Sequence, residues 1–103
     1  MIFDLTETKR EHMDEVIQIL KGISSYSPPE ASYDNIWAAF HKQPNVYSRI
    51  AAYKGSVVGY GVIIIETKIR GGKVGHIEDI VTHSNFRLKN IGATIVKSLC
   101  ELA

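Results

Sequence analysis

Apolar residues recur at helical spacing in three separate segments of the chain. Such a spacing places the apolar side chains on one face of an amphipathic helix. The first helix is expected to begin near Lys9, because Thr8 and Glu11 form a capping-box pattern, and to end at Gly22. The second is expected over residues 32–42 and the third from about Asn90. The apolar faces are, in order, Met13, Val16, Ile17, Leu20 and Ile23; Ile36, Trp37 and Phe40; Ile91, Ile95, Val96, Leu99 and Leu102.

Between the second and third helices the pattern changes to β-branched and aromatic residues. Such residues favour strands, which are predicted over residues 47–53, 57–66 and 74–82. A further short strand is expected at Ile2, Phe3 and Leu5. Lys54-Gly55-Ser56 and Gly71-Gly72 predict the turns between the longer strands. The segment from Val57 to Glu66 is almost continuously apolar, which is typical of a central strand covered on both faces.

Composition narrows the class of protein without naming a chemistry. The chain has 103 residues, 45% of them hydrophobic and 22% charged, as in an ordinary folded single domain over residues 1–103. The net charge is +1, with 12 basic and 11 acidic residues interspersed, so a dedicated nucleic-acid surface is not expected. The longest apolar run, Val62 to Ile65, is too short to span a membrane. A single cysteine, Cys100, fits a reducing compartment, and we expect a cytoplasmic protein.

The end of the chain carries an expectation of its own. The apolar pattern of the last helix is still running at Ala103, without a closing glycine or proline. The strand before it would be an open sheet edge unless a further strand covers it. We therefore expect the domain to be truncated after its third helix.

The most specific chemistry lies where the last strand passes through a basic turn into a helix that begins beside Gly92. The N-terminus of a helix presents free backbone N–H groups and the positive end of the helix dipole, and therefore favours phosphate. Arg87 and Lys89 would add charge there. The alternative is an ordinary turn with two solvated basic side chains.

The sequence Arg87-x-x-Asn90-x-Gly92-Ala93 resembles the acetyl-CoA-binding motif of the GNAT superfamily of N-acetyltransferases. Gly75-His76-Ile77-Glu78-Asp79-Ile80 and the segment 63–68 more particularly resemble the glucosamine 6-phosphate N-acetyltransferases of that superfamily. The resemblance implies an α/β (α+β) fold, with a mixed, mostly antiparallel sheet flanked by helices. It also implies transfer of acetyl from acetyl-CoA to an amino sugar phosphate, without a metal, on the way to UDP-GlcNAc.

The resemblance further implies a set of acetyl-CoA contacts. Backbone groups of Ile80, Val81 and Thr82 would hold the acyl-pantetheine arm. The turn would cradle the pyrophosphate through Arg87, Leu88, Lys89, Asn90, Ile91, Gly92 and Ala93. Asn90 replaces a glycine of the family pattern, and asparagine tolerates a positive φ better than other residues with a side chain.

The implied acceptor contacts are Ser24, Glu78, Asp79 and the backbone of Ile80. One of the two carboxylates would bind sugar hydroxyls or receive the ammonium proton. Since adjacent strand residues point to opposite faces, Glu78 and Asp79 are not expected to act as a pair.

Lys68 and Arg70 would clamp the sugar phosphate from the partner subunit, which implies a homodimer. An exposed basic loop is the alternative interpretation. The family tyrosine that protonates the thiolate has no counterpart in this chain.

Two other functions stay open. One is an acetyltransferase of the same fold that acts on a polyamine, an antibiotic or a protein amine. The other is a non-catalytic module for acyl-CoA binding or assembly. The four histidines show no metal-ligand spacing, and His76 and His83 are expected to be structural or exposed.

Overall fold

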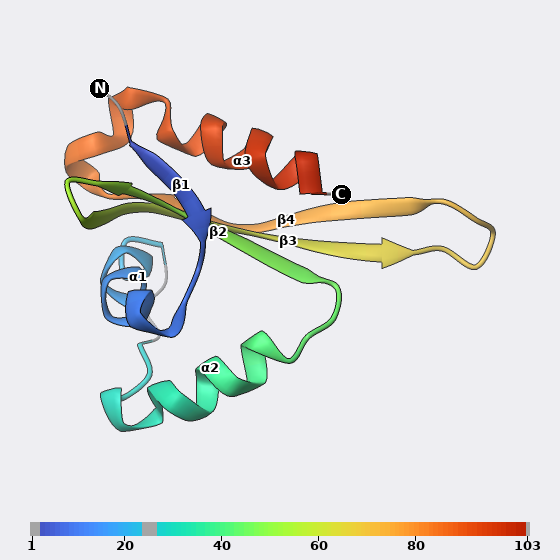
Figure 1. The fold of residues 1–103 in the computed structure, drawn as a ribbon, viewed down its shortest axis with the longest axis horizontal. Helices are drawn as coiled ribbons and strands as arrows, with labels where there is room; N and C mark the ends of the chain where they lie inside the picture. Colours follow the sequence, from blue (N-terminus) through green and yellow to red (C-terminus); the bar gives the residue numbers. More distant parts are fainter. Residues whose placement is uncertain (1–2, 24–26, 103) are drawn as a thin grey trace.

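The computed structural model describes residues 3–23 and 27–102. The chain forms one sheet with helices on both of its sides (Figure 1). In chain order the elements are β1 (Asp4–Glu7), η1 (Arg10–His12), α1 (Met13–Leu20), η2 (Glu30–Ser32), α2 (Tyr33–His41), β2 (Val46–Tyr53), β3 (Ser56–Thr67), β4 (Lys73–Thr82), η3 (Ser84–Lys89) and α3 (Ile91–Leu102). The predicted helices and strands are confirmed within a few residues of their expected bounds. The strand expected at Ile2, Phe3 and Leu5 corresponds to β1, and Ile2 itself lies outside the described residues.

The start of the first helical segment differs from the predicted capping box. Thr8 is buried, with 6% of its surface exposed, because β1 carries it into the interior. The N-cap is Lys9, whose backbone N–H donates to Nδ1 of His12 at 2.9 Å. The prediction that Thr8 caps this helix was therefore wrong, because the Thr8 hydroxyl makes no hydrogen bond among the described residues and Lys9 occupies the N-cap position.

The sheet has the order β1-β2-β3-β4, and all three pairings are antiparallel. The turn between β2 and β3 has φ +50° at Lys54 and +83° at Gly55. Two positive φ values in succession match the right-handed twist of a tight hairpin. The predicted α/β architecture, a sheet flanked by helices, is confirmed, with antiparallel pairing throughout the described strands.

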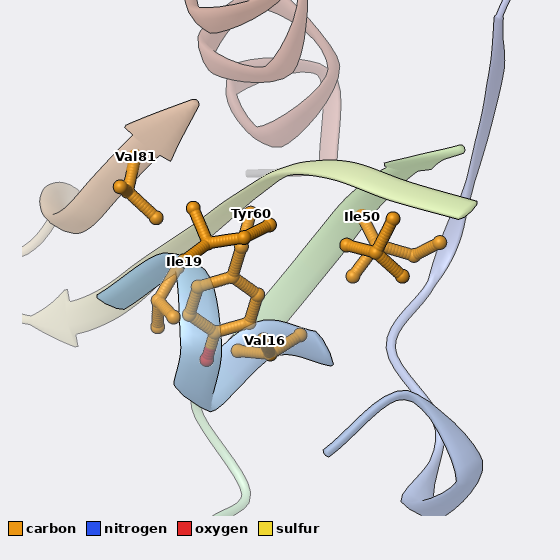
Figure 2. Packing of buried hydrophobic residues seen from close by; sticks show 7 residues of the cluster. Val16, Ile19, Ile50, Tyr60 and Val81 are labelled. Carbon is orange, nitrogen blue, oxygen red and sulfur yellow. The ribbon is translucent and has the colours of Figure 1, made fainter. Parts of the chain in front are cut away.

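The core consists of two clusters, one on each side of the sheet. Figure 2 shows the first, in which Val16 and Ile19 of α1 pack against Ile50, Tyr60 and Val81 of three strands. In the second cluster, α3 packs against β2 and β3 through Ile91, Ile95, Leu99, Ala51, Val58 and Ile63. Burial on both sides explains why β3 is apolar at almost every position.

Two glycines of β3 allow α3 to lie close to the sheet. A Cβ at Gly59 would come within 2.8 Å of Ile91 and Ile95, and one at Gly61 within 2.5 Å of Ile80. Such distances are too short for packed carbon atoms, so a side chain at either position would force the neighbouring isoleucines to shift. This close packing fixes the N-terminus of α3 beside the end of β4.

Candidate functional site

β4 contains a bulge at Asp79 and Ile80. Tyr60 pairs with Val81 and Val62 pairs with Glu78, so two residues of β4, Asp79 and Ile80, lie opposite Gly61 alone. Asp79 has φ +49°, a left-handed conformation that is uncommon for residues with a side chain. A strained residue in a strand is a recurring mark of functional sites.

The bulge changes which side of the sheet Glu78 shares with Val81. Strict alternation would place Glu78 and Val81 on opposite faces, yet their partners Val62 and Tyr60 both belong to the cluster on the α1 side, because the bulge inserts an extra residue between them. That Glu78 and Asp79 do not act as a pair stays a prediction.

The negative charge of Asp79 acts on the buried phenol of Tyr60. Burial raises the pKa of the Tyr60 phenol, and the negative charge of Asp79 raises it further. In Figure 2 the Tyr60 ring lies beside Val16 and Ile19 of α1. The charge of Asp79 thus acts on a group buried on the α1 side of the sheet.

The backbone of β4 beyond the bulge offers hydrogen-bonding groups. The N–H of His83 donates to the carbonyl of Val58 at 2.8 Å. Since antiparallel residues alternate between paired and outward-pointing backbone groups, the N–H and carbonyl of Thr82 point away from β3. Among the described strands, β3 is the sole neighbour of β4. Thr82 therefore has the free edge that an extended ligand needs, whereas the alternation directs the backbone of Val81 toward Tyr60.

A cavity of about 170 Å³ lies beside the C-terminal end of β4 and extends to the C-terminal end of α1. It is lined by Gln18, Ile19, Gly22, Thr82, His83 and Ser84. His83 also caps η3, since its Nδ1 accepts the N–H of Asn85 at 3.2 Å. The sequence missed η3, because its cap depends on a histidine in place of the usual cap residues.

The N-terminus of α3 is formed around Asn90. This residue has φ +57° and ψ +24°, the conformation that asparagine was expected to tolerate. Its carbonyl accepts the N–H of Thr94 at 3.1 Å and the Thr94 hydroxyl at 2.9 Å. The N–H groups of Ile91, Gly92 and Ala93 precede this first helical bond and have no partner inside the helix.

The space around Gly92 is more open than the space around Gly59 and Gly61. A Cβ at Gly92 would meet the Thr82 hydroxyl at 3.6 Å and Ile80 at 3.8 Å, both ordinary contact distances. Packing inside the chain therefore does not require a glycine here, whereas close approach of a pyrophosphate to the backbone does. The residues present fit the diphosphate of acetyl-CoA. The side chains of Arg87, Leu88 and Lys89 lie outside the described part of the structure, and so does Ser24. Their predicted contacts stay predictions.

Lys68 lies in a cluster on the β3–β4 hairpin that the sequence did not reveal. Glu66 Oε1 is 3.0 Å from Lys68 Nζ and 2.9 Å from His76 Nε2. The hydrogen bond from His76, and then that from Lys68, lowers the pKa of Glu66. Glu66 and His76 lie diagonally across the ladder, a relationship that appears only once the hairpin register is known.

Arg70 lies in the turn of the same hairpin, next to Gly71 and Gly72. The Thr67–Lys73 pair is five steps along the hairpin from the Val62–Glu78 pair. At about 3.4 Å per residue this separates the Thr67–Lys73 pair from Glu78 by roughly 17 Å along the hairpin, and the backbone of Lys68 and Arg70 lies beyond that pair. The structure therefore does not bring the two predicted phosphate ligands to the carboxylates of the same chain.

No group of three or more His, Cys, Asp or Glu side chains within residues 3–23 and 27–102 is placed to hold a metal ion. In the described part of the chain, no helix combines the length and the apolar character needed to cross a membrane.

Comparison with known proteins identifies similar sequences over most of the chain. Residues 13–103 match the model of the Acetyltransferase (GNAT) family. Glucosamine 6-phosphate N-acetyltransferase 1 of Dictyostelium discoideum is 41% identical over 63 residues, which are 56% of this chain and 40% of that protein. The glucosamine 6-phosphate N-acetyltransferase of Trypanosoma brucei brucei is 30% identical over 90 residues, covering 82% of this chain and 60% of its own length. The chain thus spans less than two thirds of these two relatives.

Solved structures share the fold. Glucosamine-6-phosphate N-acetyltransferase from Arabidopsis thaliana matches 98% of this chain and 74% of its own, with a TM-score of 0.87 and 23% identity. A putative acetyltransferase from Agrobacterium tumefaciens matches 97% of this chain and 72% of its own, with a TM-score of 0.88 and 19% identity. At these identities the likeness concerns the fold.

Proposed function

Since this chain belongs to the acetyltransferase (GNAT) family, we propose that it transfers an acetyl group from acetyl-CoA to the amine of an amino sugar phosphate, glucosamine 6-phosphate. Residues 1–103 would act as one domain or as part of one. The observation that carries the proposal is the open backbone at Gly92, at the N-terminus of α3 and beside Thr82. The names of the two relatives described above support the acceptor.

Acetyl-CoA would bind along the end of β4 and the start of α3. The pyrophosphate would lie on the N–H groups of Ile91, Gly92 and Ala93, with Arg87 and Lys89 adding charge and Leu88 and Asn90 shaping the turn. The pantetheine arm would pair with outward-pointing backbone groups, as an added strand does. The backbone N–H and carbonyl of Thr82 point away from β3, whereas those of Val81 point toward it.

The neutral acceptor amine would attack the thioester carbonyl directly, without a nucleophile from the enzyme. As the N–C bond forms the C–S bond breaks, and CoA leaves as a thiolate that takes up a proton released by the acetylated nitrogen, through water. Only a neutral amine is nucleophilic, so the ammonium form must first lose a proton. Glu78 or Asp79 would receive that proton, directly or through water, while the other would bind sugar hydroxyls. Ser24 and the Ile80 backbone would contribute further contacts. The left-handed backbone at Asp79 supports a role for this bulge in positioning groups at the reaction centre.

A homodimer would place the hairpin of one subunit at the carboxylates of the other. Lys68 and Arg70 lie beyond a strand pair that is itself roughly 17 Å from Glu78 along the hairpin, so a phosphate clamp built from them would need a second copy.

A different amine acceptor, without a phosphate, is the second candidate. The ion pair between Lys68 and Glu66 favours it, because that lysine already has an anionic partner.

The first test is a calorimetric titration of the chain with acetyl-CoA, with Gly92→Glu as the control. We expect binding by the parent and none by the variant, because a carboxylate at that position would occupy and repel the pyrophosphate site. Absence of binding by the folded parent would reject the donor site. Acetylation rates with glucosamine 6-phosphate and with glucosamine would then separate the two acceptor classes, since only the first presents a phosphate to Lys68 and Arg70.

A further inference from the structure

A second cavity lies at the opposite edge of the sheet from β4. β1 ends at Glu7, which pairs with Arg49, and leaves residues 46–48 of β2 without a strand neighbour on that side. A cavity of about 270 Å³ opens there between α2, β2 and the end of α3. The cavity is lined by β2, and in the sheet order β1-β2-β3-β4 the strand β3 lies between β2 and β4, which carries the candidate acetyl-CoA site.

Two polar atoms at this cavity are buried without a hydrogen-bond partner among the described residues. They are the hydroxyl oxygen of Thr8 and Nε of Arg49. Thr8 is more than nine-tenths buried. A buried donor without an acceptor is unfavourable, so an acceptor that enters the cavity beside Arg49 would stabilise it. A carboxylate matches the planar guanidinium of arginine better than other acceptors do.

An exposed carboxylate, that of Glu7, stands at the rim of the same cavity. Glu7 and Arg49 are directly opposite each other across β1 and β2, yet they form no ion pair in the described structure. Both line the cavity. Two unlike charges that flank one cavity without bonding to each other suit a ligand that carries both charges itself.

The remaining wall is aromatic. Trp37 stacks on His41 with ring centroids 5.4 Å apart and an interplanar angle of 19°, and its ring centroid is 5.9 Å from that of Phe40. Both Trp37 and Phe40 are half-buried and line the cavity. This surface favours an apolar group beside the charged pair.

We propose that this cavity binds a free α-amino acid with an apolar side chain. Arg49 and Thr8 hold its carboxylate, Glu7 holds its ammonium group, and Trp37 and Phe40 contact its side chain. The proposal is independent of acetyl transfer, because none of these five residues belongs to the acetyl-CoA or acceptor sites.

Trp37 is the only tryptophan of the chain, so its fluorescence reports directly on the cavity. The probe is L-phenylalanine, titrated without acetyl-CoA and compared with 3-phenylpropionate, which lacks the amine, and phenethylamine, which lacks the carboxylate. We expect a saturable change with L-phenylalanine and at least about tenfold weaker binding of both analogues, since each loses one charged contact. Equal affinity for all three, or no saturable change with any, would overturn the proposal and leave a cavity filled by water.

Charge-removing variants give a second test that misfolding cannot imitate. Glu7→Gln is expected to weaken L-phenylalanine about tenfold and to spare 3-phenylpropionate. Arg49→Gln is expected to weaken L-phenylalanine and to spare phenethylamine. Lys97→Gln, at an exposed position of α3, is the matched control and is expected to change nothing. A loss of affinity for all three probes in both variants, or an equal loss in the control, would contradict the assigned contacts.

Discussion

Oε2 of Glu15, on α1, accepts a hydrogen bond from the backbone N–H of Val57 at 2.8 Å, across 42 residues of sequence. The bond ties α1 to the first residues of β3, at the start of the strand that runs through both clusters of the core. It is part-buried, so its carboxylate replaces water as the partner of a strand N–H group.

Removal of this carboxylate should destabilise the fold. Glu15→Ala leaves the Val57 N–H without its partner, and we expect a loss of about 1–3 kcal/mol in the free energy of unfolding. Glu15→Gln keeps an amide oxygen in place and should lose less. Urea unfolding followed by circular dichroism measures both. An alanine variant as stable as the parent would show that water replaces the carboxylate fully.

The glycines of β3 and α3 should respond differently to alanine. Gly61→Ala forces a Cβ to within 2.5–2.6 Å of Ile80 and Ile95 and should cost about 1–3 kcal/mol. Gly92→Ala meets only ordinary contacts, so its stability should stay within about 0.5 kcal/mol of the parent. Thermal unfolding compares the two. The same Gly92→Ala variant should bind acetyl-CoA more weakly in calorimetry, and unchanged affinity would argue against close approach of the pyrophosphate to this residue.

Asn90 should tolerate glycine better than alanine. Its φ of +57° costs an ordinary L-residue about 1 kcal/mol, so Asn90→Ala should lose about that much stability. Glycine adopts this conformation freely, so Asn90→Gly should be close to the parent. Denaturant unfolding of the three proteins is the measurement, and an alanine variant equal to the glycine variant would show that the backbone there relaxes.

Tyr60 should make the protein less stable at alkaline pH. Because its pKa is raised above the ordinary value of 10.0, the unfolded chain loses the phenolic proton at a lower pH than the folded chain. This contribution is fully present below about pH 10 and declines above it, by up to about 1.4 kcal/mol per pH unit. Urea unfolding at several pH values from 9 to 11.5 should show a smaller decline for Tyr60→Phe. Parallel curves for the two proteins would exclude Tyr60 as the cause.

Glu66 should titrate below its ordinary value of 4.5, because His76 and Lys68 donate hydrogen bonds to its carboxylate. Carbon-detected NMR of the Glu66 side chain between about pH 2 and pH 7 measures the midpoint. His76→Phe should raise the midpoint more than Lys68→Met, since the bond from His76 has the larger effect. A sugar phosphate that draws Lys68 away should also raise it. Identical midpoints in parent and variants would mean that the cluster is open in solution.

The regular elements could be predicted because their signals are local. A helical apolar spacing or a β-branched run needs only the neighbouring residues, and α2, β3 and α3 are accordingly close to their expected bounds. The positive φ of Asn90 could also be anticipated, since it follows from the residue type and the turn.

The features that could not be predicted from the sequence depend on contacts between residues that are distant along the chain. Thr8 carries a capping pattern, but the pairing of β1 with β2 buries it. The bulge at Asp79 arises from the register against Gly61, and no local pattern in β4 marks it. The motif around Gly92 was visible in the sequence, whereas the open space beside it required the packing of α3 on Ile80 and Thr82.

α3 packs against the sheet through more buried side chains than α2 does. α3 buries Ile91, Ile95 and Leu99, whereas Tyr33 is the only buried residue of α2. Segments with few buried apolar contacts open at lower free energy than the rest of a domain. Backbone amides of α2 should therefore exchange with solvent long before those of α3, while the sheet between them stays folded. The wall that carries Trp37 would then be the part of the molecule that a bound ligand orders most.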